Sequence, residues 1–202
     1  MRTNLDVKVG LTLLVFAALG LLAAYATRAA FSNTTENTGN RFQTGSVTIG
    51  DNDLGTALYD LYDGTPAAKP GNSDSGCIKV TYSGSLDADV RLYSTSTLND
   101  NLLDDNLQLV ITPGTGNALD CSDFASGGQA AIFSNTLANF MANRNSYTNG
   151  LVDYPGTTAT KWVTSDAVTY KFEITLTDDA DVNDAQGLAT GLHSYTWEAR
   201  SQ

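Results

Sequence analysis

The segment from residue 168 to residue 176 alternates strictly between apolar and polar side chains. Its apolar members are Val168, Tyr170, Phe172, Ile174 and Leu176, and they are separated by Thr169, Lys171, Glu173 and Thr175. Successive side chains of a β-strand point to opposite faces, so this alternation predicts a strand with one buried and one exposed face. A sheet built from such strands must cover its apolar face with a second layer.

Four further stretches repeat this alternation over shorter lengths. They lie at residues 78–82, 88–92, 107–111 and 192–199. A Tyr-Ser-Gly-Ser turn at 82–85 separates the first two, which we expect to pair as antiparallel neighbours. Polar linkers join the strands, and no regular alternation of strands with helices occurs. We therefore predict an all-β, antiparallel two-sheet β-sandwich.

One stretch has a helical period instead. Phe133, Leu137, Phe140 and Met141 recur at the spacing of one helix face, and Ser134 is available as an N-cap. The pattern predicts a short helix that packs on the sheet.

The alternation changes parity near the start of the domain. Phe42 and Thr44 fall on one parity, whereas Val47 and Ile49 fall on the other, and Gly45 lies between the two pairs. Glycine inside a strand is typical of a bulge or bend. We expect one at Gly45.

The N-terminal residues have the pattern of an export signal. Arg2 and Lys8 precede residues 10–27, which carry no charge and are rich in Leu and Ala. We predict a signal peptide over residues 1–30 and one β-sandwich domain over residues 31–202. At about 1.5 Å per residue the apolar stretch approaches the thickness of a bilayer core, so an uncleaved membrane anchor is the alternative.

This signal predicts a secreted protein. Its expected partners during export are the export and signal-peptidase machinery, with membrane contact only through the N-terminal segment. The formal net charge of -11 and the lack of any Lys/Arg cluster exclude nucleic acid as a partner, because nucleic acid requires clustered positive charge. Anionic lipid surfaces are excluded for the same reason.

Cys77 and Cys121 are the only two cysteines of the chain. An even pair in an exported protein predicts a disulfide. The alternative is a cysteine nucleophile, which would need the single histidine, His193, as its partner. No neighbouring residue marks either thiol as activated.

The remaining polar motifs do not predict an enzyme or a cofactor. One histidine cannot supply the ligands of a zinc hydrolase. The acidic loop at 179–190 begins with the spacing of a calcium loop, but it has Asp184 where that loop needs Gly and Thr190 where it needs Glu. We interpret it as a solvated acidic loop, as we do Asp51 and Asp53, and we predict no catalytic residue, metal or cofactor.

Several stretches resemble, in their order along the chain, the TasA and camelysin family, whose signal peptides are of the SipW-dependent type. They are Ala29-Ala30-Phe31-Ser32-Asn33, Thr38-Gly39-Asn40, Phe42 with Gly45, Ser46-Val47-Thr48-Ile49, Lys69-Pro70-Gly71, residues 77–86, and Tyr195-Thr196-Trp197-Glu198-Ala199. The resemblance implies a jelly-roll β-sandwich that serves as the subunit of biofilm-matrix fibres or of a cell-surface layer.

The resemblance also implies how such subunits assemble. In donor-strand exchange, the N-terminal segment of one subunit completes the sheet of the next, and here that segment is residues 31–50. The implied assembly residues are Phe31, Phe42, Gly45, Val47 and Ile49. The implied partners are further copies of this chain, together with other matrix or cell-wall components.

Two other functions compete with this reading. Camelysin members have been described as metalloproteases, although the residues that such a role would need are not visible here. The second alternative is a monomeric adhesin or sugar-binding module. Its candidate residues are Tyr59, Tyr62, Tyr147, Tyr154 and Trp162.

Overall fold

The computed structural model describes residues 3–26, 43–59, 68–98, 102–156, 159–178 and 187–201. The chain divides into two compact units, Met1–Gln43 and Thr44–Gln202. Phe31, Phe42, Tyr62 and the loop residues 179–186 lie outside the described residues.

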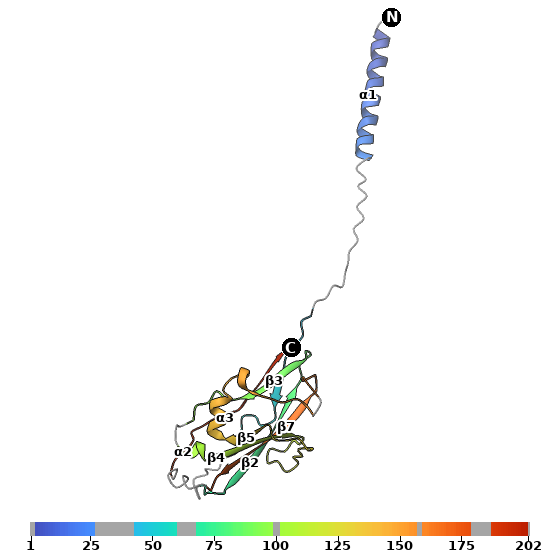
Figure 1. Ribbon diagram of the computed structural model, residues 1–202. Coiled ribbons are helices and arrows are strands. Elements are labelled where there is room, and N and C mark those ends of the chain that lie inside the picture. Colours follow the sequence, from blue (N-terminus) through green and yellow to red (C-terminus); the bar gives the residue numbers. More distant parts are fainter. Residues whose placement is uncertain are drawn as a thin grey trace. The chain divides into compact units, whose positions relative to one another are not determined.

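The N-terminal unit contains helix α1, Thr3–Ala26, drawn in blue in Figure 1. The side chains described on it, residues 8–19, are exposed, including Leu13, Leu14 and Phe16. Within the side chains that the structure describes, no helix has both the length and the hydropathy of a membrane span. The signal peptide over residues 1–30 stays a prediction.

The second unit is a sandwich of two antiparallel sheets, as the alternation predicted (Figure 1). The five-stranded sheet has the order β1-β2-β7-β4-β5, formed by Ile49–Asp51, Ser73–Tyr82, Ala167–Leu176, Leu107–Gly114 and Phe133–Thr136. The three-stranded sheet has the order β6-β3-β8, formed by Leu151–Val152, Ala88–Tyr93 and Thr196–Ser201. Short helices complete the domain: α2 at Leu102–Asp105, α3 at Leu137–Asn143 and the 3-10 turn η1 at Tyr147–Asn149. The all-β fold class is confirmed.

The core lies between the two sheets and follows the predicted parity. Strand β7 is central in its sheet, between β2 and β4. Its inward side chains Tyr170, Phe172 and Ile174 are at most 2% exposed. Each large apolar side chain buried in this way stabilises the fold by about 1.5–3 kcal/mol.

The turn after β2 does not form the hairpin that we predicted. Strand β2 belongs to the five-stranded sheet and β3 to the three-stranded one, so the two do not pair. Beyond Tyr82 the chain continues alongside the segment that leads into β1, where Ser83 N–H donates to the Thr48 carbonyl at 2.9 Å. The Tyr82 hydroxyl donates to the Leu86 carbonyl at 2.5 Å. These bonds hold a crossing between the sheets instead of a reversal within one.

The last strand begins later than predicted. Strand β8 starts at Thr196, whereas the alternation had placed its start at residue 192. Gly191 has a φ of 81°, in the left-handed region that favours glycine, and Ser194 N–H donates to Ser96 Oγ at 2.9 Å. The turn at Gly191 and the bond to Ser96 keep the backbone out of the sheet until Thr196.

The predicted helix is present but shorter, and its cap differs. Phe133 belongs to β5, and α3 begins at Leu137. Thr136 Oγ1, not Ser134, accepts the capping bond from Asn139 N–H at 3.2 Å. The buried side chains of α3 are Leu137, Phe140 and Met141, so the prediction of a helix packed on the sheet is confirmed.

Candidate assembly site

The described part of the predicted donor segment lies on the sheet of its own chain. Strand β1 pairs antiparallel with the end of β2, with Ile49 opposite Tyr82 and Asp51 opposite Val80. Upstream, Ser85 N–H donates to the Ser46 carbonyl at 2.9 Å, and Ser46 N–H donates to Ser85 Oγ at 2.9 Å. Residues 46–51 are therefore bound within the domain.

Gly45 occupies a tight place in this segment. A Cβ added to Gly45 would overlap the side chain of Leu86, which is 41% exposed. Residues 43–48 precede the strand, so the predicted bulge within a strand is not found. The glycine permits a close approach to Leu86 instead.

Val47 and Ile49 differ in their burial. Val47 is 37% exposed, whereas Ile49 is half-buried and packs against the core. The structure thus places Gly45, Val47 and Ile49 together along one sheet edge. Of these, Ile49 contributes to the fold of its own chain.

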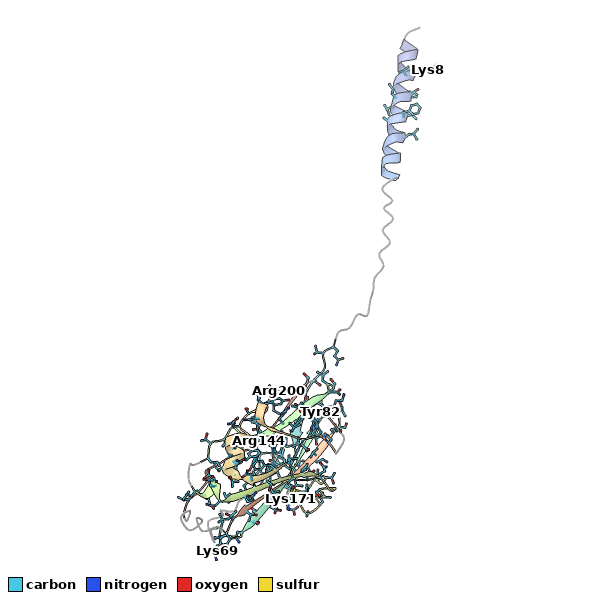
Figure 2. The ribbon with its side chains drawn as sticks, viewed as in Figure 1. Lys8, Lys69, Tyr82, Arg144, Lys171 and Arg200 are labelled. Carbon is cyan, nitrogen blue, oxygen red and sulfur yellow. A yellow bond between two sulfur atoms is a disulfide. The ribbon has the colours of Figure 1, made fainter. Side chains whose placement is uncertain are left out.

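The rest of the outer edge of β2 is also covered. Cys77 N–H donates to the Leu119 carbonyl at 2.8 Å, and Lys79 N–H donates to Asn52 Oδ1 at 2.8 Å. The disulfide between Cys77 and Cys121 holds the loop 115–132 against this strand, with the two Cα atoms 5.1 Å apart. Figure 2 shows Lys69 near one end of the domain and Tyr82 toward the other, which marks the direction of β2. The predicted disulfide is confirmed, so neither sulfur is a free thiol nucleophile.

Strand β8 has an unpaired edge in the part of the chain that the structure describes. It pairs with β3 over Thr196–Ser201 and is the outer strand of its sheet. No backbone bond joins its other side to any described segment. At six residues it is the longest of the four outer strands, since β1, β5 and β6 have three, four and two. Very short edge strands are a common protection against further pairing, and β8 lacks that protection.

The inward face of β8 and of the residue before it is incompletely covered. Tyr195, Trp197 and Ala199 pack against the core but are only half-buried. Phe172 lies beneath them, with its ring centroid 4.5 Å from that of Tyr195 and 6.0 Å from that of Trp197. An unpaired backbone edge and a partly uncovered apolar row therefore coincide, which is the arrangement that an added strand can complete.

A polar cluster beside β8 joins Tyr59 to His193 and Tyr195. The Tyr59 hydroxyl lies 2.8 Å from His193 Nε2 and 2.5 Å from the Tyr195 hydroxyl. Burial raises the pKa of Tyr59 and of Tyr195 and lowers the pKa of His193. The histidine is therefore neutral near pH 7. Because His193 Nδ1 lies 3.3 Å from the Gly191 carbonyl, which can only accept, the tautomer with the proton on Nδ1 fits and leaves Nε2 to accept.

A half-buried carboxylate, that of Asp153, lies beside the core residue Trp162. Trp162 is fully buried, and its indole N–H donates to the Asp153 carbonyl at 2.8 Å. Burial raises the pKa of the Asp153 carboxyl to about 6, against the opposing effects of the Tyr170 hydroxyl and the Tyr154 backbone. This carboxyl is consequently easier to protonate than an exposed one.

The fold brings three of the candidate sugar-binding aromatics, Tyr147, Tyr154 and Trp162, together around β3, and it places Tyr59 in the cluster with His193 and Tyr195. Trp162 is fully buried and bridges to Ala88, Tyr59 is half-buried, and the hydroxyls of Tyr147 and Tyr154 both donate to Asp89 on β3. The Arg200 guanidinium lies 3.9 Å from the Tyr147 ring centroid. An arginine thus already stacks on the ring that a sugar would need.

No group of three His, Cys, Asp or Glu side chains that could hold a metal ion occurs among the described residues. Asp51 and Asp53 instead shape a turn, in which Asp53 Oδ1 accepts from Gly55 N–H at 2.8 Å. The prediction for the loop 179–190 falls largely outside the described residues.

The fold and the free edge of β8 define an all-β, disulfide-bonded sandwich protein that has, in its described part, an outer strand with one unpaired edge. The chain matches no protein-family model and no curated protein. The resemblance to the TasA and camelysin family therefore rests on the sequence stretches alone.

Proposed function

We propose that this chain is an exported structural protein, the subunit of extracellular fibres of a biofilm matrix or of a cell-surface layer. Subunits join by donor-strand exchange, and further matrix or cell-wall components bind the assembled polymer. The observation that carries this proposal is the unpaired edge of β8 above the half-buried row of Tyr195, Trp197 and Ala199. The disulfide is compatible with an extracellular location.

The acceptor in this proposal is the edge of β8. A strand added there hydrogen-bonds to the backbone of Thr196–Ser201 and covers the aromatic row with alternate side chains. Strand β1 lies close to β8 at the same border of the sandwich. A donor strand that pairs with β8 extends the three-stranded sheet at this edge.

The donor comes from the predicted segment 31–50, but its two ends have different roles. Residues 46–51 pair with residues 80–86 of their own chain and complete the compact unit that begins at Thr44. Exchanging them would first break those bonds. We therefore assign the exchanged part to residues 31–43, with Phe31 and Phe42 as its large apolar side chains.

The test compares chains that begin at Phe31 and at Thr44. Both contain the whole sandwich and its disulfide, so both should unfold at the same temperature. We expect filaments in electron micrographs, and growth in light scattering, only from the longer chain. A matched control carries residues 31–43 in scrambled order and should stay monomeric.

Hydrogen exchange locates the acceptor. In the monomer, outward amides of β8 should exchange quickly while those of central β7 are protected, and in filaments the β8 amides should become protected. Filaments from the chain beginning at Thr44, or filaments that leave β8 unprotected, would contradict this assignment. If every chain stays monomeric, polymerisation itself loses its support.

A further inference from the structure

We propose that a depression on the outer face of the five-stranded sheet binds a uronic acid unit of a polysaccharide whose neighbouring units are neutral. The depression has a volume of about 320 Å³, and its lining includes Thr48, Gly50, Lys79, Thr81, Ser83 and Asn117. This volume is at the lower end of the range for small-molecule sites. The lining residues lie outside β8, so the inference does not depend on the proposed polymerisation.

Outward side chains of β1 and β2 form the floor of the depression. Lys79 and Thr81 alternate along β2 with two core residues, so they point away from the core. Gly50 lies opposite Thr81 across the strand pair. A Cβ added to Gly50 would meet no atom within 4 Å. Because this position has no side chain, the floor stays open to solvent.

Asn52 fixes the wall beside Lys79. Its side-chain amide donates to the Asn117 carbonyl at 2.9 Å, and its Oδ1 accepts from Lys79 N–H at 2.8 Å. The Asp123 carboxylate in turn accepts from Asn117 N–H at 2.9 Å. These bonds join β2 to the loop 115–132. The wall is therefore formed before a ligand arrives, which reduces the entropy lost on binding.

The ammonium group of Lys79 is available to an anion. The ion pairs among the described residues use other cations, namely Arg91, Lys161, Lys171 and Arg200. Lys79 is half-buried, and it lies in a chain whose formal net charge is -11. That net charge disfavours a densely charged polyanion, so we expect a ligand with a single carboxylate among neutral groups.

The other groups of the depression favour a sugar as the carrier of this carboxylate. The hydroxyls of Thr48, Thr81 and Ser83 can each donate or accept a hydrogen bond. Asp51 also lines the depression, and its carboxylate can only accept. A bare anion would be repelled by Asp51. A sugar acid instead places its carboxylate against Lys79 and donates a ring hydroxyl to Asp51.

The test titrates the full, isotope-labelled chain with two acidic disaccharides, glucuronosyl-xylose and galacturonosyl-rhamnose, and follows the backbone amides by NMR. The amide signals of Gly50, Lys79 and Thr81 should shift with at least one disaccharide and saturate. The same disaccharides with the carboxylate reduced to an alcohol should bind about 10-fold more weakly, because the charged hydrogen bond is lost. Acetate and triglutamate, at equal concentration, should not saturate these shifts.

Two variants of the lining residues then locate the sugar. Gly50→Val fills the floor from a position with free space and should abolish the shifts. Lys79→Gln should weaken binding by about 10-fold. Lys69→Gln is the matched control, since Lys69 is an exposed lysine outside the depression, and it should bind as the parent chain does. Thermal unfolding checks that each variant folds.

The parent chain alone is enough to overturn the proposal. If neither disaccharide gives a saturable shift, the site is rejected even where a variant fails to fold. Saturation by acetate or triglutamate at the same amides would mean that a carboxylate alone is recognised, which rejects the sugar. Binding that survives in both Gly50→Val and Lys79→Gln places the sugar elsewhere and rejects the site equally.

Discussion

Gly76 of β2 lies directly against the backbone carbonyl of Leu58, so closely that a Cβ added to Gly76 would overlap the carbonyl oxygen. Residues 52–59 therefore pass over β2 at a point where only glycine fits. Gly76→Ala should force this segment outward and reduce the free energy of unfolding by about 1–3 kcal/mol. Urea denaturation measures the change.

The control for this substitution is Gly50→Ala in β1. A Cβ at Gly50 meets no atom within 4 Å. This variant should differ from the parent chain by no more than about 0.5 kcal/mol. Equal stability of both alanine variants would show that Leu58 does not lie over β2.

The disulfide should contribute much of the stability of the domain. It links residues that are 44 positions apart, and closing a loop of that length in the unfolded chain stabilises the fold by up to about 4 kcal/mol. The double variant Cys77→Ala/Cys121→Ala should unfold at clearly lower urea concentration. Reductant should shift the parent chain but leave this variant unchanged; a shift in both would mean that reductant acts elsewhere.

The domain should be more stable in mild acid through Asp153. Burial raises the pKa of this carboxyl from 3.8 to about 6 in the folded chain. A raised folded-state pKa gives stability that is complete below the unfolded value and is lost as the pH rises through about 6. The loss between pH 4 and pH 7.5 amounts to at most about 3 kcal/mol.

Asp153→Asn isolates this contribution, since other carboxyls titrate in both chains. Asp120, Asp123 and Glu198 have lowered pKa values, chiefly because their carboxylates accept hydrogen bonds, and they act in the opposite direction as the pH falls. The difference between the two chains in urea midpoint should change through pH 6. A pH-independent difference would show that Asp153 has an ordinary pKa.

The N-cap of α3 is Thr136 in the structure, whereas the sequence pattern suggested Ser134. Thr136→Ala removes the oxygen that accepts from Asn139 N–H and should cost about 1 kcal/mol. Ser134→Ala, at the position the sequence suggested, should cost no more than about 0.5 kcal/mol because Ser134 is an exposed residue of β5. The reverse order of the two values in thermal unfolding would restore Ser134 as the cap.

The period of the side chains predicted the strands and their buried faces. Residues 168–176 lie within β7, and the stretches that begin at residues 78, 88 and 107 lie within β2, β3 and β4. A local pattern can achieve this because a strand places neighbouring side chains on opposite faces wherever it lies. The predicted export signal and the even number of cysteines likewise predicted the disulfide, although the sequence does not show that Cys77 and Cys121 lie close together.

Which strands are neighbours was decided only by the tertiary structure. The period of β2 and β3 is the same whether they pair or lie in different sheets, and the Ser46–Ser85 and Ser83–Thr48 bonds that separate them join distant residues. The meeting of Tyr59 with His193 and Tyr195 had no signal in the sequence, since these partners lie 134 and 136 positions apart. Spacing along the chain determines which faces of the strands are buried, whereas the helix cap, the free edges and the side-chain clusters depend on how the two sheets close around one core.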